Sequence, residues 1–281
     1  MVDILLASYN GEEYIADQIR SIQGQSYSNW RLLIRDDGSS DRTVEIINQI
    51  AKHDHRISLL SDHYGNKGVI GNFEILLKHS SADYIMFSDQ DDIWLPDKIS
   101  LSLNEIKKTE DENRGSAVLV FSDAYVVDNN LKIINNSYIK AERYDRIISS
   151  NFDELIIRNC IMGCTVMINS VAKGLVLPFN KYVLMHDWWI GMIVARYGKI
   201  KYLNSQTILY RQHEHNQVGS GRINRQYFYD RLLHAWRIVN INYKYYRMLK
   251  YLPFNVNIWG CIKAKLRLSL ADFNQIKKEK A

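Results

Sequence analysis

The stretch "VDILLASYNGEEYIADQIRSIQ" (residues 2–23) sets the pattern for the first half of the chain. Its first seven residues are mostly apolar and predict a buried strand, whereas "EEYIADQIRSIQ" places Ile15, Ile19 and Ile22 at helical spacing. The polar turn "YNG" separates the two. A strand, a polar turn and a helix in this order predict one unit of a parallel sheet, because the helix carries the chain back to begin the next strand.

The same unit recurs further along the chain. Apolar runs predict strands at residues 30–37, 56–61 and 82–89, and helical patterns occupy residues 41–53 and 71–80. We therefore expect an α/β fold with a Rossmann-like, mostly parallel sheet and helices on both faces. In such sheets ligands bind beyond the carboxyl ends of the strands, which is where the polar clusters of this sequence lie.

The second half is less regular. Strands are expected within residues 117–128, 163–169 and 206–213, a helix at 186–198, and a helical pattern from 222 to about 250. We expect a main domain over residues 1–221, followed by a helical appendage over residues 222–281. The domain divides into a first half (1–115) and a less regular second half (116–221).

The composition is that of a folded soluble protein, with 46% hydrophobic and 24% charged residues in 281. No apolar run reaches the roughly 18 to 20 residues that span a bilayer. The start of the chain lacks the basic region of a signal peptide. Three cysteines without a CxxC pair predict reduced thiols, neither a disulfide framework nor a zinc site.

The appendage differs sharply from the rest in charge. Residues 222–281 hold 13 Lys and Arg against 3 Asp and Glu, a net charge of +10, so residues 1–221 carry −5 of the total +5. Its basic residues alternate with tyrosines and tryptophans, as in helices that bind an anionic membrane surface. The alternatives are a solvated helical appendage or an oligomer interface. Nucleic acid is not expected as a partner, because no recognisable binding motif accompanies the charge.

The stretch "YIMFSDQDDIW" (84–94) ends an apolar strand in three carboxylates. Such charges repel one another unless a cation lies between them. Asp89 and Asp91 are suitably spaced to face one divalent cation, and the oxygen ligands favour Mn²⁺ or Mg²⁺. Asp92 has the alternative of capping the helix that begins near "LPDK".

Three further clusters have both a structural and a functional interpretation. In "DDGSSDRT" (36–43), Asp37 either stabilises a turn or accepts a hydrogen bond from a base. In "NKGVIGNF" (66–73), Lys67 belongs to a loop or lies near a diphosphate, although no P-loop motif is present. In "MHDWW" (185–189), Asp187 is either a helix N-cap or a general base, and Trp188 and Trp189 form either a sugar-binding wall or core.

A fourth cluster, "YRQHEHNQVGS" (210–220), follows a strand. Arg211 either meets a phosphate or holds the loop, and His213 is a candidate third metal ligand, while His215 is a weaker one. The glycine and asparagine content indicates a loop able to close over a bound nucleotide.

Taken in order, "ILLASYNGEEYIADQIRSIQGQSY", "LLIRDDGSSDRT", "YIMFSDQDDIWLPDKI" and "HDWW" resemble family 2 glycosyltransferases of the GT-A fold. The resemblance covers roughly residues 1–220. The segments "NKGVIGNFEILL", "DQDDIWLPDK" and "YRQHEHNQVG" are most similar to the rhamnosyltransferase-like branch that builds bacterial cell-wall or capsular polysaccharide.

The resemblance implies that residues 1–115 are the nucleotide-sugar-binding half and residues 116–221 the acceptor-binding half, and it implies a role for each matching residue. Ala7, Tyr9 and Asn10 would flank the pyrimidine or its ribose, and Asp37 would meet the base. Asp89 and Asp91 would form the DxD pair, with Asp91 the direct metal ligand and His213 an additional one. Asp187 would be the general base. The remaining assignments are Lys67 and Asp89 to the nucleotide, Arg211 to phosphate or the loop, and Asp92, Trp94, His186, Trp188 and Trp189 to the acceptor.

The expected activity is an inverting, metal-dependent transfer from a nucleoside-diphosphate sugar, dTDP-L-rhamnose before UDP-hexose or UDP-HexNAc, to a saccharide acceptor that is lipid-linked. The expected location is the cytoplasmic face of the cell membrane. "HDWW" departs from the Glu-Asp pair of many relatives, which leaves the acceptor and the role of His186 open. The rivals are a DxD phosphotransferase, which would need Thr or Val after the second Asp, and a non-catalytic binding or scaffold protein, against which the intact Asp89, Asp91 and Asp187 argue.

Overall fold

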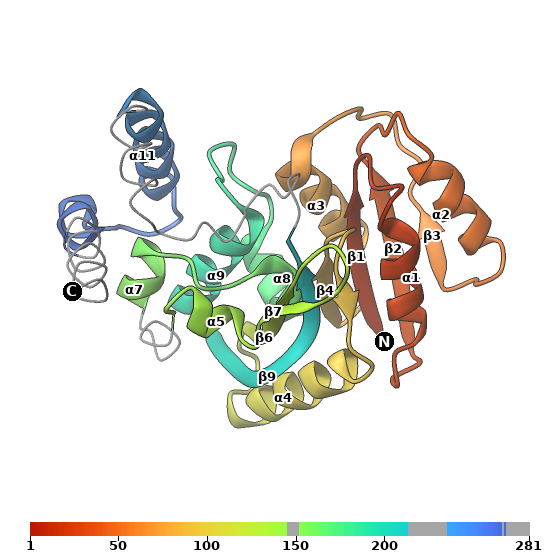
Figure 1. The fold of residues 1–281 in the computed structure, drawn as a ribbon. Coiled ribbons are helices and arrows are strands. Elements are labelled where there is room, and N and C mark those ends of the chain that lie inside the picture. Colours follow the sequence, from red (N-terminus) through yellow and green to blue (C-terminus); the bar gives the residue numbers. More distant parts are fainter. Residues whose placement is uncertain (145–151, 213–234, 266, 268–281) are drawn as a thin grey trace.

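The computed structural model describes residues 1–144, 152–212, 235–265 and 267 (Figure 1). One nine-stranded sheet runs through the described part, in the order β3-β2-β1-β4-β8-β6-β9-β5, with β7 paired to β6. The strands are β1 (Val2–Ser8), β2 (Trp30–Asp36), β3 (Ile57–Leu59), β4 (Tyr84–Ser88), β5 (Ile93–Trp94), β6 (Val118–Val127), β7 (Ile133–Asn135), β8 (Val166–Asn169) and β9 (Lys199–Arg211).

The helices follow the expected alternation in the first half and depart from it in the second. They are α1 (Ile15–Gln23), α2 (Thr43–Ala51), α3 (Gly68–His79), α4 (Lys98–Glu112), α5 (Tyr138–Ala141), α7 (Phe152–Ile157), α8 (Ser170–Val176), α9 (His186–Tyr197) and α11 (Ala235–Lys250), with a 3₁₀ turn at Gly163–Thr165. The first strand and the first helix end at Ser8 and Gln23, as predicted, although the helix begins at Ile15, three residues later than expected.

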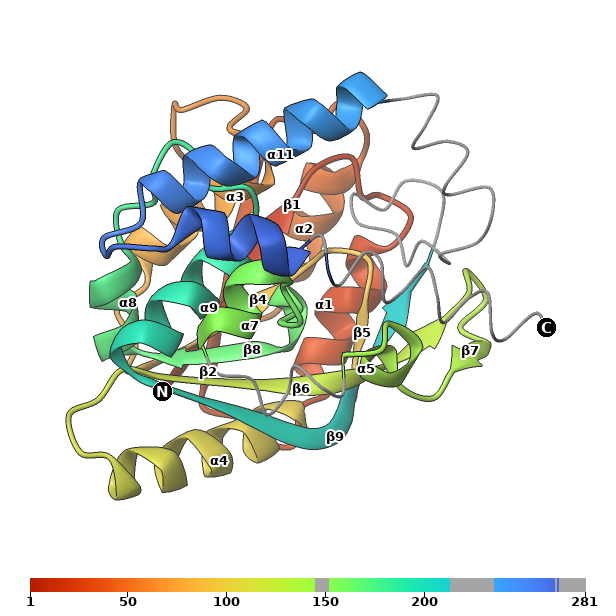
Figure 2. The same cartoon turned by 90° about the vertical axis from the view of Figure 1, so that its left-hand side faces the viewer.

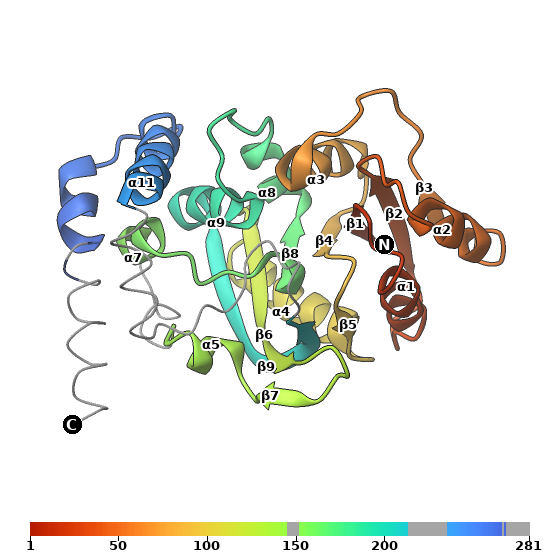
Figure 3. The same cartoon turned by 45° about the horizontal axis from the view of Figure 1, so that its top comes forward.

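Helices cover both faces of the sheet, as predicted (Figures 1 and 3). Along β1 the side chains alternate between two hydrophobic cores, because successive residues of a strand point to opposite faces. Ile4 and Leu6 pack with α1, α2 and α4, whereas Leu5 packs with α3, α8 and α9. The sheet is thus the middle layer of three.

The direction of the strands corrects one expectation. β3, β2, β1 and β4 are parallel, and so are β6 and β9, which run side by side in Figure 2. β8 lies antiparallel between β4 and β6, and β5 and β7 also pair antiparallel. The sheet is therefore mixed. After β6 the chain passes through β7, α5 and α7 instead of a single crossover helix, so nothing forces β8 into the parallel direction.

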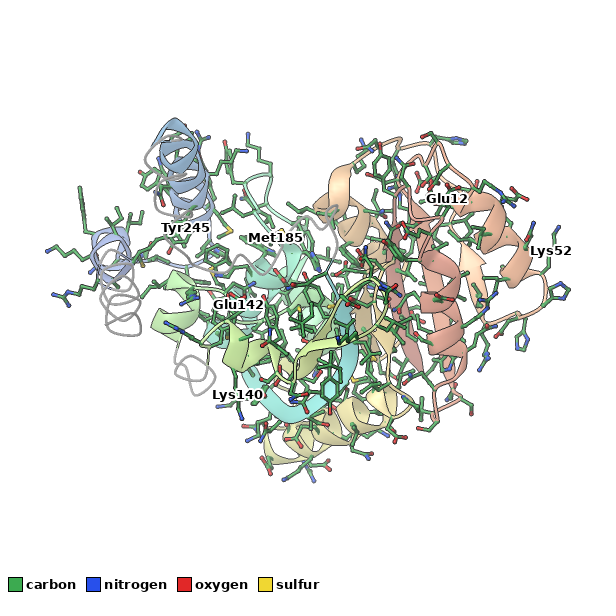
Figure 4. The ribbon with its side chains drawn as sticks, viewed as in Figure 1. Glu12, Lys52, Lys140, Glu142, Met185 and Tyr245 are labelled. Atoms are coloured by element: carbon green, nitrogen blue, oxygen red, sulfur yellow. The ribbon has the colours of Figure 1, made fainter. Side chains whose placement is uncertain are left out.

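The described part of the appendage packs on the main domain. Tyr245, Met248 and Leu249 of α11 are buried in the same core as α9. Figure 4 shows Tyr245 directed from α11 towards α7, where its hydroxyl donates to the Ile156 carbonyl at 2.6 Å. In the described part of the appendage, α11 is therefore a docked helix, and Lys244 and Lys250 lie on its exposed face.

Candidate active site

The loop after β1 is fastened to the loop after β2. Asn10 adopts a positive φ of 47°, which Asn tolerates better than most residues. Its Oδ1 accepts from the Ser40 amide at 2.9 Å, and its own amide donates to Ser39 Oγ at 2.7 Å. Tyr9 is 49% exposed, and Ala7 is half-buried at the end of β1. The three residues expected to flank a nucleotide therefore lie together at the carboxyl end of β1.

The Asp37 carboxylate fixes the backbone at the start of α3. Its Oδ1 pairs with Arg35 Nη1 at 2.7 Å and accepts from the Lys67 amide at 2.8 Å, while its Oδ2 accepts from the Gly68 amide at 2.7 Å. Arg35 also pairs with Asp62, so one buried guanidinium joins two loops. A carboxylate has roughly four acceptor positions. The three hydrogen bonds to Asp37 leave about one position for a hydrogen bond from a nucleotide base. The Lys67 side chain itself lies on the exposed surface.

Asp89 and Asp91 follow β4 directly, and Asp187, about a hundred residues later in the chain, faces the same place. Burial, and then the charges of Asp91 and Asp187, raise the pKa of Asp89 to about 7. The ion pairs of the described residues include none to Asp89. The tertiary structure therefore brings carboxyl groups from both halves of the chain together in one place.

Gln90 turns away from these carboxylates towards the nucleotide side. Its Oε1 accepts from the Tyr9 amide at 2.9 Å, and its Nε2 donates to the Tyr9 carbonyl at 3.0 Å. The side chain thus pairs with a backbone peptide in both directions. It connects the loop after β4 with the loop after β1.

Asp92 and Trp94 lie in the interior, contrary to their expected contact with the acceptor. Asp92 is 1% exposed, the Cys164 thiol donates to it, and burial raises its pKa well above the usual range. Asp92 is not the helix cap either, since the residue preceding α4 is Asp97. Trp94 is 2% exposed, and the buried Lys98 ammonium lies 4.7 Å from the centre of its ring. Both side chains support the β4–β5 turn from within.

The acidic cluster has the chemistry of a divalent-cation site. One ligand atom each from Asp89, Asp92 and Cys164 lies within 4.8 Å of the others. Asp92 Oδ2 is a buried oxygen for which the described residues supply no hydrogen-bond donor. Carboxylate oxygens are the ligands that Mg²⁺ and Mn²⁺ prefer. Asp89 and Asp92 are therefore the described carboxylates whose oxygens lie close enough together to hold such an ion, whereas the expected partner, Asp91, is not part of this group.

Arg211 fixes the loop after β4 through hydrogen bonds to backbone carbonyls. Its Nε donates to the Asp91 carbonyl at 3.0 Å and its Nη1 to the Asn129 carbonyl at 2.7 Å. The guanidinium also lies 4.7 Å from the centre of the Tyr14 ring. Of the two roles considered for Arg211, these contacts favour holding the loop. His213 lies outside the described residues, so its role as a ligand stays a prediction.

Asp187 lies in the first turn of α9 with its carboxylate fixed by three donors. Oδ1 accepts from the Trp188 amide at 2.6 Å and from Asn159 Nδ2 at 3.2 Å, and Oδ2 accepts from the Gly163 amide at 3.1 Å. Burial raises its pKa to about 6, and these hydrogen bonds oppose the rise. A carboxylate of that pKa is ionised at neutral pH and close to the value that suits a general base.

His186 lies in the core, whereas its neighbour Asp187 faces the carboxylate cluster. Its ring is 3% exposed and packs on Phe73, with centroids 4.1 Å apart, and on Phe87 at 5.5 Å. Burial lowers its pKa to about 3, so the ring is neutral. Neither ring nitrogen has a hydrogen-bond partner among the described residues. The placement does not support the expected acceptor contact, because the two phenyl rings cover the imidazole.

The two tryptophans of α9 are structural in their observed positions. Trp189 is 4% exposed and donates through Nε1 to the Val176 carbonyl at 3.0 Å. Trp188 is half-buried, donates to the Leu155 carbonyl at 2.8 Å and stacks on Tyr245 with centroids 5.3 Å apart. Of the two interpretations, core packing fits both side chains, and Trp188 forms the seat for α11.

Comparison with known proteins decides the family. The model described as "Glycosyl transferase family 2" matches residues 3–175. The chain belongs to this family. The transferase is 30% identical over 205 residues to UDP-Glc:alpha-D-GlcNAc-diphosphoundecaprenol beta-1,3-glucosyltransferase WfgD of Escherichia coli, covering 73% of each chain. It is also 30% identical over 230 residues to dTDP-rhamnosyl transferase RfbG of Shigella flexneri, covering 76% of this chain and 74% of that one.

Solved structures show that the transferase has a GT-A-type fold. Mannosyltransferase PcManGT from Pyrobaculum calidifontis, in complex with GDP-Man and Mn²⁺, aligns with a TM-score of 0.61 at 13% identity, over 95% of this chain and 68% of that one. TarS residues 1–349 from S. aureus, in complex with UDP-GlcNAc, align with a TM-score of 0.55 at 17% identity, over 89% and 71%. The transferase is thus an enzyme of a family whose members here act in bacterial polysaccharide synthesis.

Three features of the site cannot be recognised from the sequence alone. Gln90 occupies the variable middle position of DxD, so its residue type carries no motif. Asn159 and the Gly163 amide, which fix Asp187, come from a segment without a strong pattern. Arg35 looks like an ordinary exposed strand residue, although its position two residues before Asp37 puts it on the same face of the strand end.

Proposed function

We propose that this transferase moves a sugar from a pyrimidine nucleoside diphosphate to a saccharide acceptor, with inversion at the anomeric carbon and with a divalent cation. The observation that carries the proposal is the convergence of Asp89 and Asp91, after β4, with Asp187, at the start of α9. In this proposal Asp89 and Asp91 face the donor diphosphate, and Asp187 faces the acceptor.

Asp187 would act as the general base. Its Oδ2 accepts only one hydrogen bond from the described residues, from Gly163, whereas Oδ1 accepts two, so Oδ2 retains capacity for a proton. The acceptor hydroxyl would lose its proton to this oxygen while its own oxygen bonds to the anomeric carbon. The bond from that carbon to the diphosphate breaks in the same displacement, which gives inversion.

Asp89 and Asp91 would hold Mn²⁺ or Mg²⁺, with His213 as a further ligand. A bound cation offsets the charge that develops on the departing diphosphate. The hydrogen bond from Arg211 to the Asp91 carbonyl holds the segment Asp89–Asp91 in place before a cation or a nucleotide binds. The metal-binding pair is then preorganised by the protein and not by the substrate.

The nucleotide would lie over the loop of Ala7, Tyr9 and Asn10, with Asp37 and Lys67 at its edge. The relatives differ in donor, since one is named for UDP-Glc and another for dTDP-rhamnose. We place dTDP-L-rhamnose first and UDP-glucose second. The acceptor is proposed to be lipid-linked, as the name of the Escherichia coli relative describes for that protein.

The appendage is proposed to attach the enzyme to the inner face of the membrane. No helix in the described part of the chain is both long and apolar enough to cross a bilayer. Beyond α11, Trp259 is 74% exposed and Ile262 is 37% exposed, and Lys263 is exposed beside them. Exposed aromatic and basic side chains on one short segment suit an anionic lipid surface. Binding to anionic vesicles should fall on Trp259→Ala with Lys263→Ala, and unchanged co-sedimentation would refute the attachment.

A panel of nucleotide sugars tests the function. Thermal unfolding with and without Mn²⁺ should show the largest stabilisation by the true donor, because a ligand that binds the folded state raises the midpoint. Transfer or donor hydrolysis should then require the metal and collapse in Asp91→Ala. Full activity in EDTA would refute the metal dependence. Stabilisation by a purine nucleotide sugar alone would refute the pyrimidine donor.

A further inference from the structure

The segment Asp89–Asp91 is held by side chains from two directions. Arg211 binds its carbonyl at Asp91, and Gln90 pairs with both polar groups of Tyr9, at 2.9 and 3.0 Å. Tyr9 belongs to the loop proposed to carry the nucleotide, and the aspartates belong to the loop proposed to carry the metal. Gln90 therefore joins the two loops directly through hydrogen bonds.

Gly11 leaves the space that Gln90 fills. A Cβ at position 11 would lie 2.2 Å from Gln90 Oε1, 2.4 Å from Cδ and 2.8 Å from Nε2. These are the atoms of the amide that pairs with Tyr9, and they are the three nearest to such a methyl group, so Gly11→Ala displaces that amide. Gly11 has a negative φ, outside the glycine-favouring region, so space and not backbone conformation explains the glycine here.

We propose that Gln90 is a positioning residue that couples nucleotide binding to metal binding. It touches neither ligand; it makes the position of Tyr9 depend on the position of Asp89 and Asp91. Metal binding would then tighten nucleotide binding by more than the direct contact between the ion and the diphosphate. The inference rests on the proposed function, since it assigns the nucleotide to Tyr9 and the cation to the aspartates.

The measured quantity is the metal enhancement, the ratio of the dissociation constant for dTDP or UDP in EDTA to that in saturating MnCl₂, by titration calorimetry. Gln90→Ala should lower this ratio about thirtyfold, the amount that two neutral hydrogen bonds of ordinary net strength supply. The dissociation constant in EDTA should change little. A residue that merely stabilised the loop would weaken binding in both conditions alike.

Gly11→Ala should reproduce the loss, because it expels the same amide. The double variant with Gln90→Ala should be no worse than either single variant, since the methyl group then has no amide to displace. Matched controls are Gly174→Ala, where a Cβ meets nothing within 4 Å, and Gln49→Ala on the exposed face of α2; both should keep the wild-type ratio.

Three results would overturn the coupling: a wild-type ratio in Gln90→Ala, equal weakening with and without Mn²⁺, or costs that multiply in the double variant. If Gly11→Ala does not fold, Gln90→Ala decides alone, because it only shortens a half-buried side chain. A wild-type enzyme that binds neither dTDP nor UDP would refute the proposed function and the inference with it. A wild-type enzyme with Mn²⁺-dependent binding that the variants share would refute the inference alone.

Discussion

The two halves of the site are built in different ways. On the proposed donor side, Tyr9, Asp37 and Asp89 each come directly after a parallel strand, and side chain–backbone hydrogen bonds join the loops of neighbouring strands. On the proposed acceptor side, Asp187 lies at the start of a helix and is fixed by Asn159 and Gly163, from the segment before β8. The donor side is therefore built at the ends of adjacent parallel strands, and the proposed base comes from a helix of the second half of the chain.

The largest effect should come from removing the base. Asp187→Asn should lower kcat about a thousandfold, within the range that general-base catalysis contributes. Nucleotide binding in Mn²⁺ should stay within about twofold, because the donor side does not depend on Asp187 for its shape. Titration calorimetry with dTDP or UDP serves as the control for folding. Near-normal turnover would mean that another group accepts the proton, and the division into two halves would fail.

The buried Arg35 cluster tests the donor side by stability. Arg35→Met leaves Asp37 and Asp62 without their guanidinium and should lower the free energy of unfolding by about 3 kcal/mol, as breaking a buried ion pair does. Urea denaturation measures the change. Arg42→Met is the matched control, because the pair of Arg42 with Glu45 is exposed and its loss should leave the midpoint in place. Equal effects of the two substitutions would show that the loops of the donor side do not depend on Arg35.

The pH dependence separates the base from the metal ligands. Burial raises the pKa of Asp187 from its ordinary value to about 6, and only the ionised form accepts a proton. At saturating Mn²⁺, kcat/KM should therefore fall about tenfold per pH unit below about pH 6 and be flat above it. The residual activity of Asp187→Asn should lack this acid limb. An unchanged limb in that variant would assign it to Asp89 or to the substrate.

The smallest expected effect concerns the docking of the appendage. Tyr245→Phe removes the hydrogen bond to the Ile156 carbonyl and keeps the stacking on Trp188, so it should cost about 1 kcal/mol of unfolding free energy. Limited proteolysis should cut at α11 sooner than in the wild type. Tyr246→Phe, on the exposed side of the same helix, is the control. A resistant Tyr245→Phe would show that apolar burial alone seats the helix.

Prediction from the sequence succeeds where the physics is local. Ile15, Ile19 and Ile22 are buried on α1 as their spacing predicts, and the carboxylates after the strand of residues 84–88 lie at the strand end. It fails where residue type leaves the environment open. Trp94 and Trp188 suit a sugar or a core equally well by composition, and their burial depends on neighbours that fold in from elsewhere.

The sequence by itself determined the parallel first half of the sheet, the identity of the carboxylates and the basic character of the appendage, because periodicity, turn residues and net charge are properties of short segments. Only the tertiary structure decided the antiparallel insertion of β8, the approach of Asp187 to Asp89 and the pairing of Gln90 with Tyr9. Each of these brings together segments that are 80 or more residues apart, and no local pattern specifies a contact whose partner is that distant.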